Sequence, residues 1–279
     1  MAINLASKYS GQIQTAYVKE SLVAGRLRDD YDFTGVKTIT ILTPTTVPMN
    51  DYKRTGSNRY GEPTEMQDTK QELTVTQDRS FALTVDKGNN GDQMNVKGAG
   101  KMLKLQIAER AVPEYDKYCL NVLATKAGTV KTDEALSKAN IIDRISLATE
   151  ELDNAEVPED GRTLWITAGG YKLLRHSEEF LAVDKLAEQS LTKGTVGTYD
   201  NMTVIKVPAS RMPEGVNFIV AHKRAATAPV KIHETKIHQD PPGLSGHLLE
   251  GREYYDCFVF EAKKKGVYAD KTATAAASE

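Results

Sequence analysis

The first 35 residues carry only scattered apolar positions, such as Ile13, Tyr17, Leu22 and Leu27, among charged and small residues. This spacing predicts at best a weakly amphipathic helix. Such a segment buries too little apolar surface to offset the entropy lost when it becomes ordered. We therefore expect residues 1–35 to form an arm that docks on another surface, with a neighbouring chain as one candidate.

From Val36 the pattern changes to alternation, and the β-branched residues of VKTITILT predict a strand. A second alternating stretch, LTVTQDRSFALTV, begins at Leu73. The polar residues between them contain prolines and glycines and lack an apolar stripe, and unstructured segments this long are usually functional. Because the two strands can pair antiparallel, we expect a two-stranded arm that projects from the body.

Charges of both signs alternate along this projecting segment, which suits contact with a mixed-charge protein surface better than contact with a phosphate backbone. They are Asp51, Lys53, Arg54, Arg59, Glu62, Glu65, Asp68 and Lys70.

The strongest helical stripe in the chain follows the turn DKGNNGD, with apolar residues at every fourth position. Its members are Ala99, Leu103, Ile107, Ala111, Tyr115 and Cys119. Asn95 is a candidate N-cap. Pro113 lies inside the pattern, but the stripe keeps its phase from Ala111 to Tyr115, so we predict one long helix bent at Pro113. Roughly 30 residues at about 1.5 Å each would span on the order of 45 Å.

The rest of the chain predicts a small sheet covered by helices, followed by further strands. Ile141, Ile145, Ala148 and Leu152 define an amphipathic helix, and AGGYKLLRHSEEFLA predicts another. The predicted strands are TLWIT, MTVIKVP, VNFIVA, PVKIHETKIH, EYYDCFVFEA and GVYAD, with DPPGLSGHLLEG as a loop and TATAAASE as a disordered tail. Alternation should place one ring of the pair Tyr254 and Tyr255 in the core and the other at a surface or interface.

Composition and charge exclude several classes of protein. Lys and Arg total 36 against 38 Asp and Glu, so a net charge of −2 gives no general attraction to nucleic acid or to an anionic membrane. Cys119 and Cys257 lie far apart and suggest small core side chains in a reducing compartment rather than a disulfide framework or a zinc site. Neither a leader pattern nor an apolar run long enough for a membrane helix is present, so we expect a cytoplasmic protein.

Motifs that carry catalytic chemistry are largely missing. His233 and His238 form the only close histidine pair, and their odd spacing places the two rings on opposite faces of a strand, a poor arrangement for one metal ion. GAGK at 98–101 departs from a phosphate loop, and no nucleophile has a recognisable base. We predict no enzyme, no cofactor and no metal. An enzyme with the loop as a lid would need polar groups around the ends of TLWIT and MTVIKVP.

The order of these elements resembles the major capsid proteins of tailed bacteriophages with the Hong Kong 97-like fold. The stretches NVKGAGKMLKLQIAERAVPEYDKY, LDNAEVPEDGRTLWITAGGYKLL and QDPPGLSGHLLEGREYYDCFVFEAKKKGVYAD carry the resemblance, which covers roughly residues 1–270. It implies an α+β fold. The implied parts are an N-terminal arm (1–35), an extension loop built as a β-hairpin (36–88), a peripheral domain with the spine helix and a long sheet (89–140 and 222–270), a helix-and-sheet axial domain (141–221) and a flexible tail (271–279).

The resemblance implies a structural role, that of a subunit whose hexamers and pentamers build the icosahedral head shell around double-stranded phage DNA. Such a subunit belongs to the virion and assembles in the cytoplasm of the bacterial host. A shell of this kind also implies a portal. The inter-subunit contacts are expected from the extension loop, and Pro113 is the expected bend. The candidate contact residues are Lys53, Arg54, Arg59, Glu62, Glu65 and Lys70.

Three finer expectations follow. The arm begins almost at once, so we expect a separate scaffolding protein. No sequence context marks Lys53 or Lys70 as reactive, and we predict no covalent crosslink between subunits. Contact with packaged DNA should be weak, non-specific and salt-sensitive, since the chain is nearly neutral. A shell protein of an encapsulin-type nanocompartment, which shares the fold but encloses cargo enzymes, is the alternative.

Overall fold

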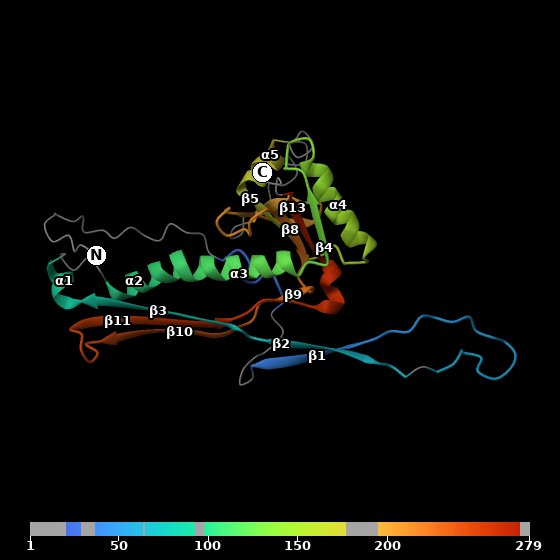
Figure 1. Ribbon diagram of the computed structural model, residues 1–279, viewed down its shortest axis with the longest axis horizontal. Coiled ribbons are helices and arrows are strands. Elements are labelled where there is room, and N and C mark those ends of the chain that lie inside the picture. The colour runs from blue at the N-terminus through green and yellow to red at the C-terminus, as the bar shows by residue number, and fades with distance from the viewer. Residues whose placement is uncertain (1–20, 29–36, 64, 93–97, 177–194, 274–279) are drawn as a thin grey trace, which may run out of the picture.

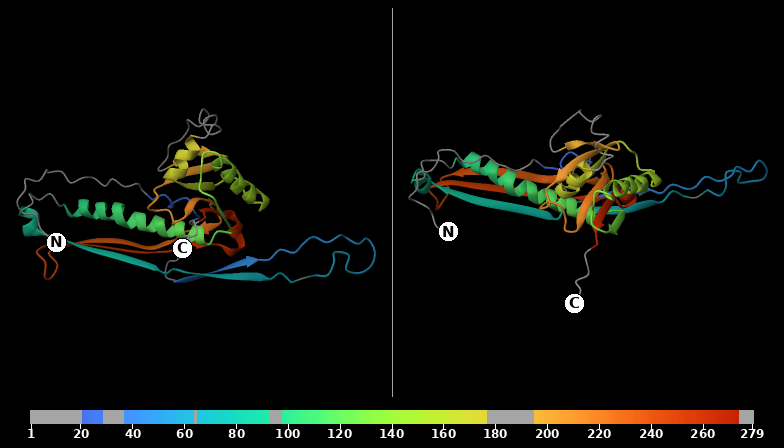
Figure 2. Two further views of the ribbon diagram at one scale, coloured as in Figure 1. Left: turned by 45° about the horizontal axis from the view of Figure 1, so that its top comes forward. Right: turned by 90° about the horizontal axis from the view of Figure 1, so that it is seen from above.

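The computed structural model describes residues 21–28, 37–63, 65–92, 98–176 and 195–273. A long helix lies along a narrow sheet, a compact region sits over one end of that helix, and a two-stranded ribbon projects beyond it (Figures 1 and 2). Within the described ranges, no helix is long and apolar enough to cross a membrane.

The compact region is a six-stranded mixed sheet with helices on both faces. Its strands run in the order β4, β13, β8, β5, β7, β6. Their bounds are β4 (Thr129–Asp133), β5 (Arg162–Thr167), β6 (Thr195–Tyr199), β7 (Met202–Val207), β8 (Val216–His222) and β13 (Val267–Thr272). The helices α4 (Ile141–Asn154) and α5 (Ala168–Arg175) confirm the predicted starts of both helices, and residues 177–182 of the second prediction lie outside the described residues.

The alternation of β5 shows how the layers are built. Leu164 and Ile166 pack in one cluster with Ile145 of α4 and Leu174 of α5, whereas Trp165 packs in the cluster of α3 on the other face. Successive side chains of a strand point to opposite faces, so a strand covered on both sides becomes apolar at nearly every position. This is why TLWIT reads as an unbroken buried run.

The long helix is continuous, as the stripe predicted. The segments α2 (Ala99–Gln106), a π-helical turn η1 (Ile107–Ala111) and α3 (Val112–Thr125) follow one another without a gap. The Val112 N–H donates to the Ile107 carbonyl, five residues back. Pro113 has no N–H for the ordinary bond four residues back, and a π turn directly before it accommodates this loss. The bend at Pro113 stays a prediction, and Asn95 lies outside the described residues.

The narrow sheet under α2 contains β3 (Gln77–Asp86), β10 (Val230–Gln239) and β11 (Gly246–Tyr255), with β11 in the centre. Val85, Leu103 and Leu249 form the small core between sheet and helix. The prediction of a loop over DPPGLSGHLLEG was wrong for its second half, which is the first half of β11. Gly246 and Gly251 obscure the strand pattern in the sequence, yet both are paired with β3.

The ribbon is formed by β1 (Thr38–Pro44) and β2 (Asp68–Thr74), which pair antiparallel from Thr38 opposite Thr74 to Pro44 opposite Asp68. The predicted antiparallel two-stranded arm is present, but only Leu73 and Thr74 of the predicted second strand take part in it. The second predicted strand was wrong in its extent, because β2 starts at Asp68 and a break divides it from β3. At the break the Asp256 carboxylate accepts from both the N–H (2.8 Å) and the hydroxyl (2.9 Å) of Thr76, which removes that backbone from a strand ladder.

Several shorter elements lie in the described residues. They are α1 (Lys87–Asp92), β9 (Ala226–Thr227), β12 (Phe258–Val259) and a 3-10 turn η2 (Glu261–Gly266). The predicted turn DKGNNGD is thus the short helix α1, whose first turn is capped by the Asp86 carboxylate through the Asn89 N–H (2.9 Å). The predicted strand EYYDCFVFEA is broken after Tyr255, where the Asp256 carboxylate accepts from the Cys257 N–H (2.7 Å).

The strand pairing crosses the implied domain division at three places. β3, which was placed in the extension loop, pairs with β11. β4 and β13, which were placed in the peripheral domain, belong to the six-stranded sheet. β13 continues to Thr272, into the predicted tail, and residues 274–279 lie outside the described residues. The division into domains therefore stays an expectation.

The end of the N-terminal arm docks on its own chain. Leu22, Val23 and Leu27 are buried in the cluster around α3, and the Trp165 indole N–H donates to the Leu22 carbonyl (2.9 Å). The buried Asp116 carboxylate accepts from the Ser21 hydroxyl (2.6 Å), the Leu22 N–H (2.9 Å) and the Arg211 guanidinium (2.5 Å). The expectation of a docked arm is therefore met within this chain for residues 21–28, whereas residues 1–20 and 29–35 lie outside the described residues.

Candidate inter-subunit interface

The base of the ribbon is fixed firmly to the body. Leu73, Val75 and Phe260 form a small buried cluster, against which Ile39 and Ile41 of β1 pack. The Gln71 side chain donates to the Val259 carbonyl (3.1 Å) and accepts from the Glu261 N–H (3.0 Å). These contacts set the direction in which the ribbon leaves the body, so the loop at its far end is held at a defined place.

Beyond β1 and β2, the described residues 45–63 and 65–67 belong to a loop closed by local bonds, which we call the ribbon loop. The Lys53 N–H donates to the Arg59 carbonyl (2.9 Å), and the Gly61 N–H donates to the Asn58 carbonyl (3.0 Å). The Tyr52 and Tyr60 rings meet edge to face with centroids 5.0 Å apart. Gly61 has a positive φ of 89°, a conformation that glycine adopts without strain. Local hydrogen bonds and one aromatic contact thus define the conformation of the ribbon loop, although it has no hydrophobic core.

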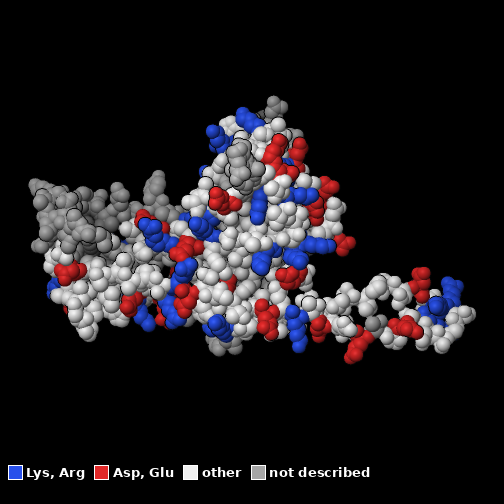
Figure 3. All heavy atoms as spheres, viewed as in Figure 1, with Lys and Arg blue, Asp and Glu red and all other residues white. Residues whose placement is uncertain are grey.

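All six charged residues that the sequence proposed for inter-subunit contact are exposed. Five lie in the ribbon loop and Lys70 lies in β2. Among the described residues, none of the six takes part in an ion pair, although the Arg59 Nε donates to the Gly56 carbonyl (3.2 Å). Figure 3 shows positive and negative side chains together on the projecting ribbon. Their role in contact stays a prediction.

Exposed apolar side chains on the ribbon are the feature that sequence reasoning missed. Met49 is 99% exposed, Tyr60 is 86% exposed and Met66 is 67% exposed. The same segment also exposes Leu42, Val47 and Tyr52. Single exposed apolar residues are ordinary, but several on one thin ribbon favour an interaction surface. They follow no period of two or 3.6, so the only available signal was their number within a segment that has no core.

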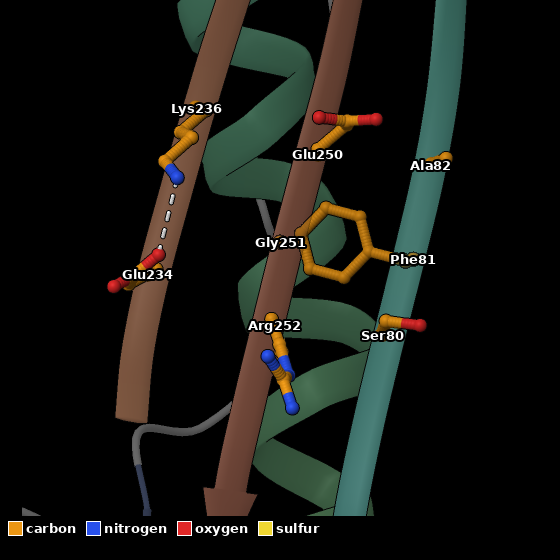
Figure 4. Close-up of a pocket in the computed structure, with 8 residues that line it drawn as sticks. All are labelled: Ser80, Phe81, Ala82, Glu234, Lys236, Glu250, Gly251 and Arg252. Carbon is orange, nitrogen blue, oxygen red and sulfur yellow. Dashed lines mark ion pairs between the residues drawn. The ribbon is translucent and has the colours of Figure 1, made fainter. Parts of the chain in front are cut away.

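A hollow of about 400 Å³ lies on the three-stranded sheet (Figure 4). The Phe81 ring lies beside Gly251, where a side chain would collide with it. The hollow is lined by charges of both signs, with Lys236 3.3 Å from Glu234. The Arg252 guanidinium, which binds both carboxylate oxygens of Asp78, lowers the pKa of that carboxyl. This is an open, mixed-charge surface rather than an enclosed pocket with a nucleophile and a base.

The histidine pair behaves as the strand spacing predicted. The His233 Nδ1 lies 3.2 Å from a Glu253 carboxylate oxygen, and the His238 Nε2 lies 3.0 Å from one of Glu250, so the two rings have separate partners. Among the described residues, no group of three or more potential ligands is placed to hold a metal ion. GAGK at 98–101 lies at the start of α2.

The remaining candidate residues serve packing. Cys119 and Cys257 are buried free thiols that form no disulfide with each other. Burial raises the pKa of the Cys119 thiol, which disfavours the reactive thiolate form. Tyr255 lies in the core, as predicted for one of the two rings, and burial raises its pKa to about 12. Its neighbour Tyr254 is half-buried at the base of the ribbon, where its hydroxyl donates to the Val75 carbonyl (2.8 Å).

Comparison with known proteins gives matches at the level of structure. No family model and no curated protein matches the sequence. A structure from Mycobacterium phage Che8 matches with a TM-score of 0.74 and 18% identity, over 95% of this chain and 96% of that chain. The capsid structure of cyanophage P-SCSP1u matches with a TM-score of 0.73 and 11% identity, over 97% and 93%.

A third similar structure is the asymmetric unit of the mature capsid of bacteriophage PhiM1, with a TM-score of 0.68 and 12% identity, over 97% of this chain and 93% of that chain. In all three cases the likeness extends over nearly the whole length of both chains, and it therefore includes the ribbon and the long helix as well as the compact region.

Proposed function

We propose that this chain, which has the Hong Kong 97-like fold of phage capsid structures, is a major capsid subunit that assembles into the icosahedral head shell of a bacteriophage around double-stranded DNA. The proposed role is structural rather than enzymatic. Its place is the virion, after assembly in the cytoplasm of a bacterial host.

One observation carries the proposal: the ribbon loop is anchored rigidly at its base and exposes apolar side chains at its far end. Burial of apolar surface contributes roughly 25 cal/mol per Å² removed from water. Met49 gains none of this within the chain and Tyr60 gains little, because they are 99% and 86% exposed. A second copy of the same chain is the partner that a homo-oligomeric shell supplies to every subunit.

The charges around the apolar tip fit the same role. Charged residues at the rim of an interface contribute mainly to specificity and to the rate of association, and both signs discriminate against wrong registers. Lys53, Arg54, Arg59, Glu62 and Glu65 surround the exposed apolar residues of the ribbon loop, and Lys70 extends the charged set onto β2. We therefore propose that these six residues orient the ribbon on the neighbouring subunit.

The partners beyond the subunit itself follow from the kind of shell. Hexamers and pentamers of this chain would form its faces and corners, a portal would occupy one corner, and a separate scaffolding protein would guide assembly. The names of the similar structures are those of phages, which supports a phage shell over an encapsulin-type compartment.

Expression of the full chain, with and without candidate scaffolding proteins from the same genome, tests the proposal. We expect closed particles or ring-shaped oligomers in negative-stain electron micrographs. The double variant Met49→Ser, Tyr60→Ser should reduce the yield of particles at least tenfold, because it removes apolar surface that only a neighbour buries. The measurement is the particulate fraction in a sucrose gradient.

Val130→Ser, Val230→Ser is the matched control, since it also removes two exposed apolar side chains but lies outside the ribbon, and it should leave the yield unchanged. A chain that stays monomeric at every concentration, with every scaffold tried, would contradict the proposal. Boiling the particles in detergent tests the predicted lack of covalent crosslinks, where a ladder of multimers on a gel would contradict that prediction.

A further inference from the structure

β10 lies at one edge of the three-stranded sheet. It pairs with β11 on one side, and within the described residues no strand pairs with its other side. Every residue from His233 to Gln239 is exposed. A strand at the edge of a sheet presents a row of N–H and C=O groups to which a strand of another chain can bond. This edge of β10 is therefore a candidate interaction surface.

The stretch from His233 to Gln239 lacks several features that commonly protect such an edge. It holds no proline and no glycine, and its pairing with β11 is regular, since the irregularity of that pairing lies between Val230 and Ile232. Proteins often use a proline, a bulge or a very short strand to keep edges apart. A lysine on the edge can serve the same purpose, but here its neighbours give it a different effect.

The charges of this stretch are complementary to a second copy of themselves. Glu234 and Lys236 lie on one face of β10, with the Lys236 Nζ 3.3 Å from a Glu234 carboxylate oxygen (Figure 4). Both side chains remain largely in water, so each can also contact a charge on another strand. If two copies of β10 lie antiparallel with Thr235 opposite Thr235, Glu234 of each copy stands opposite Lys236 of the other. Opposite charges placed directly across a strand pair stabilise it.

Symmetry restricts the register of such a pair. A two-fold axis perpendicular to the sheet keeps each face on its own side, so the axis must pass through a residue and not between two residues. An axis through Glu234 or through Lys236 would place like charges opposite each other. Of the centres from His233 to Ile237, Thr235 is the one that places Glu234 opposite Lys236. It also places Ile237, which is 43% exposed, opposite His233.

We propose that the stretch from His233 to Ile237 is a docking edge for a second copy of this chain, which adds its own β10 antiparallel around a two-fold axis through Thr235. The two three-stranded sheets then form one sheet that continues through both copies. This contact is separate from that of the ribbon loop, because it lies on β10 and is symmetric. The choice of a second copy as the partner rests on the proposed function, since an icosahedral shell brings copies together around two-fold axes.

Disulfide trapping with the variant Thr235→Cys of the full chain tests the pairing. Directly opposed Cα atoms of antiparallel strands lie about 4.5–5.5 Å apart, within the roughly 4.4–6.8 Å that a disulfide spans. The native Cys119 and Cys257 are buried, which shields them from a mild oxidant. Oxidation should therefore give a covalent dimer on a non-reducing gel, at a yield at least tenfold above that of the unaltered chain.

Ile237→Cys is the matched control, because this position is also exposed and lies on the same face as Thr235. In the proposed register the two copies of Ile237 lie about 14 Å apart along the strands, too far for a disulfide. A mixture of His233→Cys and Ile237→Cys chains should give the dimer again, because these positions stand opposite each other. Equal dimer yields from Thr235→Cys alone and Ile237→Cys alone would overturn the inference.

Exchange of the charges tests the same register independently. In the Thr235→Cys chain, Glu234→Lys places a lysine opposite Lys236 at two symmetric positions and should lower the dimer yield about tenfold. The further substitution Lys236→Glu restores opposite charges across the pair and should return the yield to within about twofold of the original. A loss that the second substitution fails to restore would overturn the proposed register, as would no loss at all.

The fractions of a sucrose gradient separate this inference from the proposed shell. If the chain forms particles in which Thr235→Cys gives no more dimer than Ile237→Cys, the shell stands and the pairing of β10 falls. If the dimer forms specifically but no particles are found, the pairing stands and the shell falls. Specific dimer within particles supports both, and no specific dimer in any fraction overturns the pairing.

Discussion

The six-stranded sheet and the ribbon loop use apolar residues in opposite ways. In β5 five successive residues are buried, because α3 covers one face of the sheet and α4 with α5 cover the other. In residues 45–67 almost every described residue is exposed, including Met49 at 99%. One region completes its core within the chain, and the other presents apolar surface that only a second molecule can cover.

The three-stranded sheet lies between these extremes. α2 covers one of its faces through Leu103, while the hollow beside Gly251 leaves part of the sheet open. The chain thus passes from a sheet covered on two faces, through one covered on a single face, to the ribbon loop, which is covered on neither. Folding of the chain and its proposed assembly therefore depend on different residues. Variants in the three regions should change the free energy of unfolding and the yield of particles independently.

The largest loss of stability should come from Asp116→Ala in the compact region. The substitution leaves the buried Arg211 without its carboxylate and removes the acceptor for Ser21 and the Leu22 N–H. Removal of one partner of a buried ion pair costs about 3–5 kcal/mol. Urea unfolding followed by the fluorescence of Trp165, the single tryptophan, measures it.

Lys117→Ala, at the next and exposed position, is the control and should change the free energy of unfolding by less than about 0.5 kcal/mol. If Asp116→Ala costs no more than this control, the docking of residues 21–28 does not depend on the buried pair.

A smaller loss should follow Gly251→Ala in the half-covered sheet. The added methyl group meets the Phe81 ring, which must move, and such overpacking costs about 1–3 kcal/mol. Gly169→Ala in α5 is the matched control, because the new methyl group meets no atom there and should stabilise the helix by about 0.5–1 kcal/mol. Opposite signs in urea unfolding are the expected result, and a stabilising Gly251→Ala would contradict the close packing of Phe81.

The smallest effect on folding should come from Tyr60→Ser in the ribbon loop. Its ring is 86% exposed, and its aromatic contact is with Tyr52 of the same loop. The free energy of unfolding should therefore change by less than about 0.5 kcal/mol. The same substitution belongs to the pair expected to reduce particle yield. A loss of unfolding free energy above about 1 kcal/mol would erase the distinction between the two regions.

Local patterns predicted those parts of the fold that depend on neighbours in sequence. The stripe from Ala99 to Cys119 predicted the long helix, and alternation predicted β1 and a two-stranded arm. The second strand of that arm was expected from Leu73 onward, whereas β2 runs from Asp68 to Thr74. The break at Thr76 could not be predicted, because the carboxylate that causes it belongs to Asp256, which is remote in sequence. The predicted strand was shorter than β11, because Gly251 has no side chain to continue the alternation. A glycine is needed at this position because the Phe81 ring of β3 occupies the space that a side chain would take.

The candidate interface was predicted by its location rather than by its chemistry. The segment between β1 and β2 stood out because it lacked a core, and the structure projects it from the body. The sequence indicated the charged residues of this segment but not Met49 and Tyr60. An apolar residue outside any periodic pattern gives no signal of whether it is buried or exposed. The docking of Leu22 on Trp165 also depends on a contact between distant residues.

The π turn accounts for the four-residue repeat of the apolar stripe on the long helix. Residues four apart are rotated by about 40° on an ideal helix, so a stripe that repeats every fourth residue would wind around it. Ile107–Ala111 holds one more residue per hydrogen-bonded turn than its neighbours and takes up part of that rotation. The extra residue of the π turn sets the rotation of α2 relative to α3. The apolar face of α2 thereby meets the three-stranded sheet, and that of α3 meets the six-stranded sheet. Removal of one residue at this point would therefore rotate the face of α2 relative to the face of α3 by about 100°.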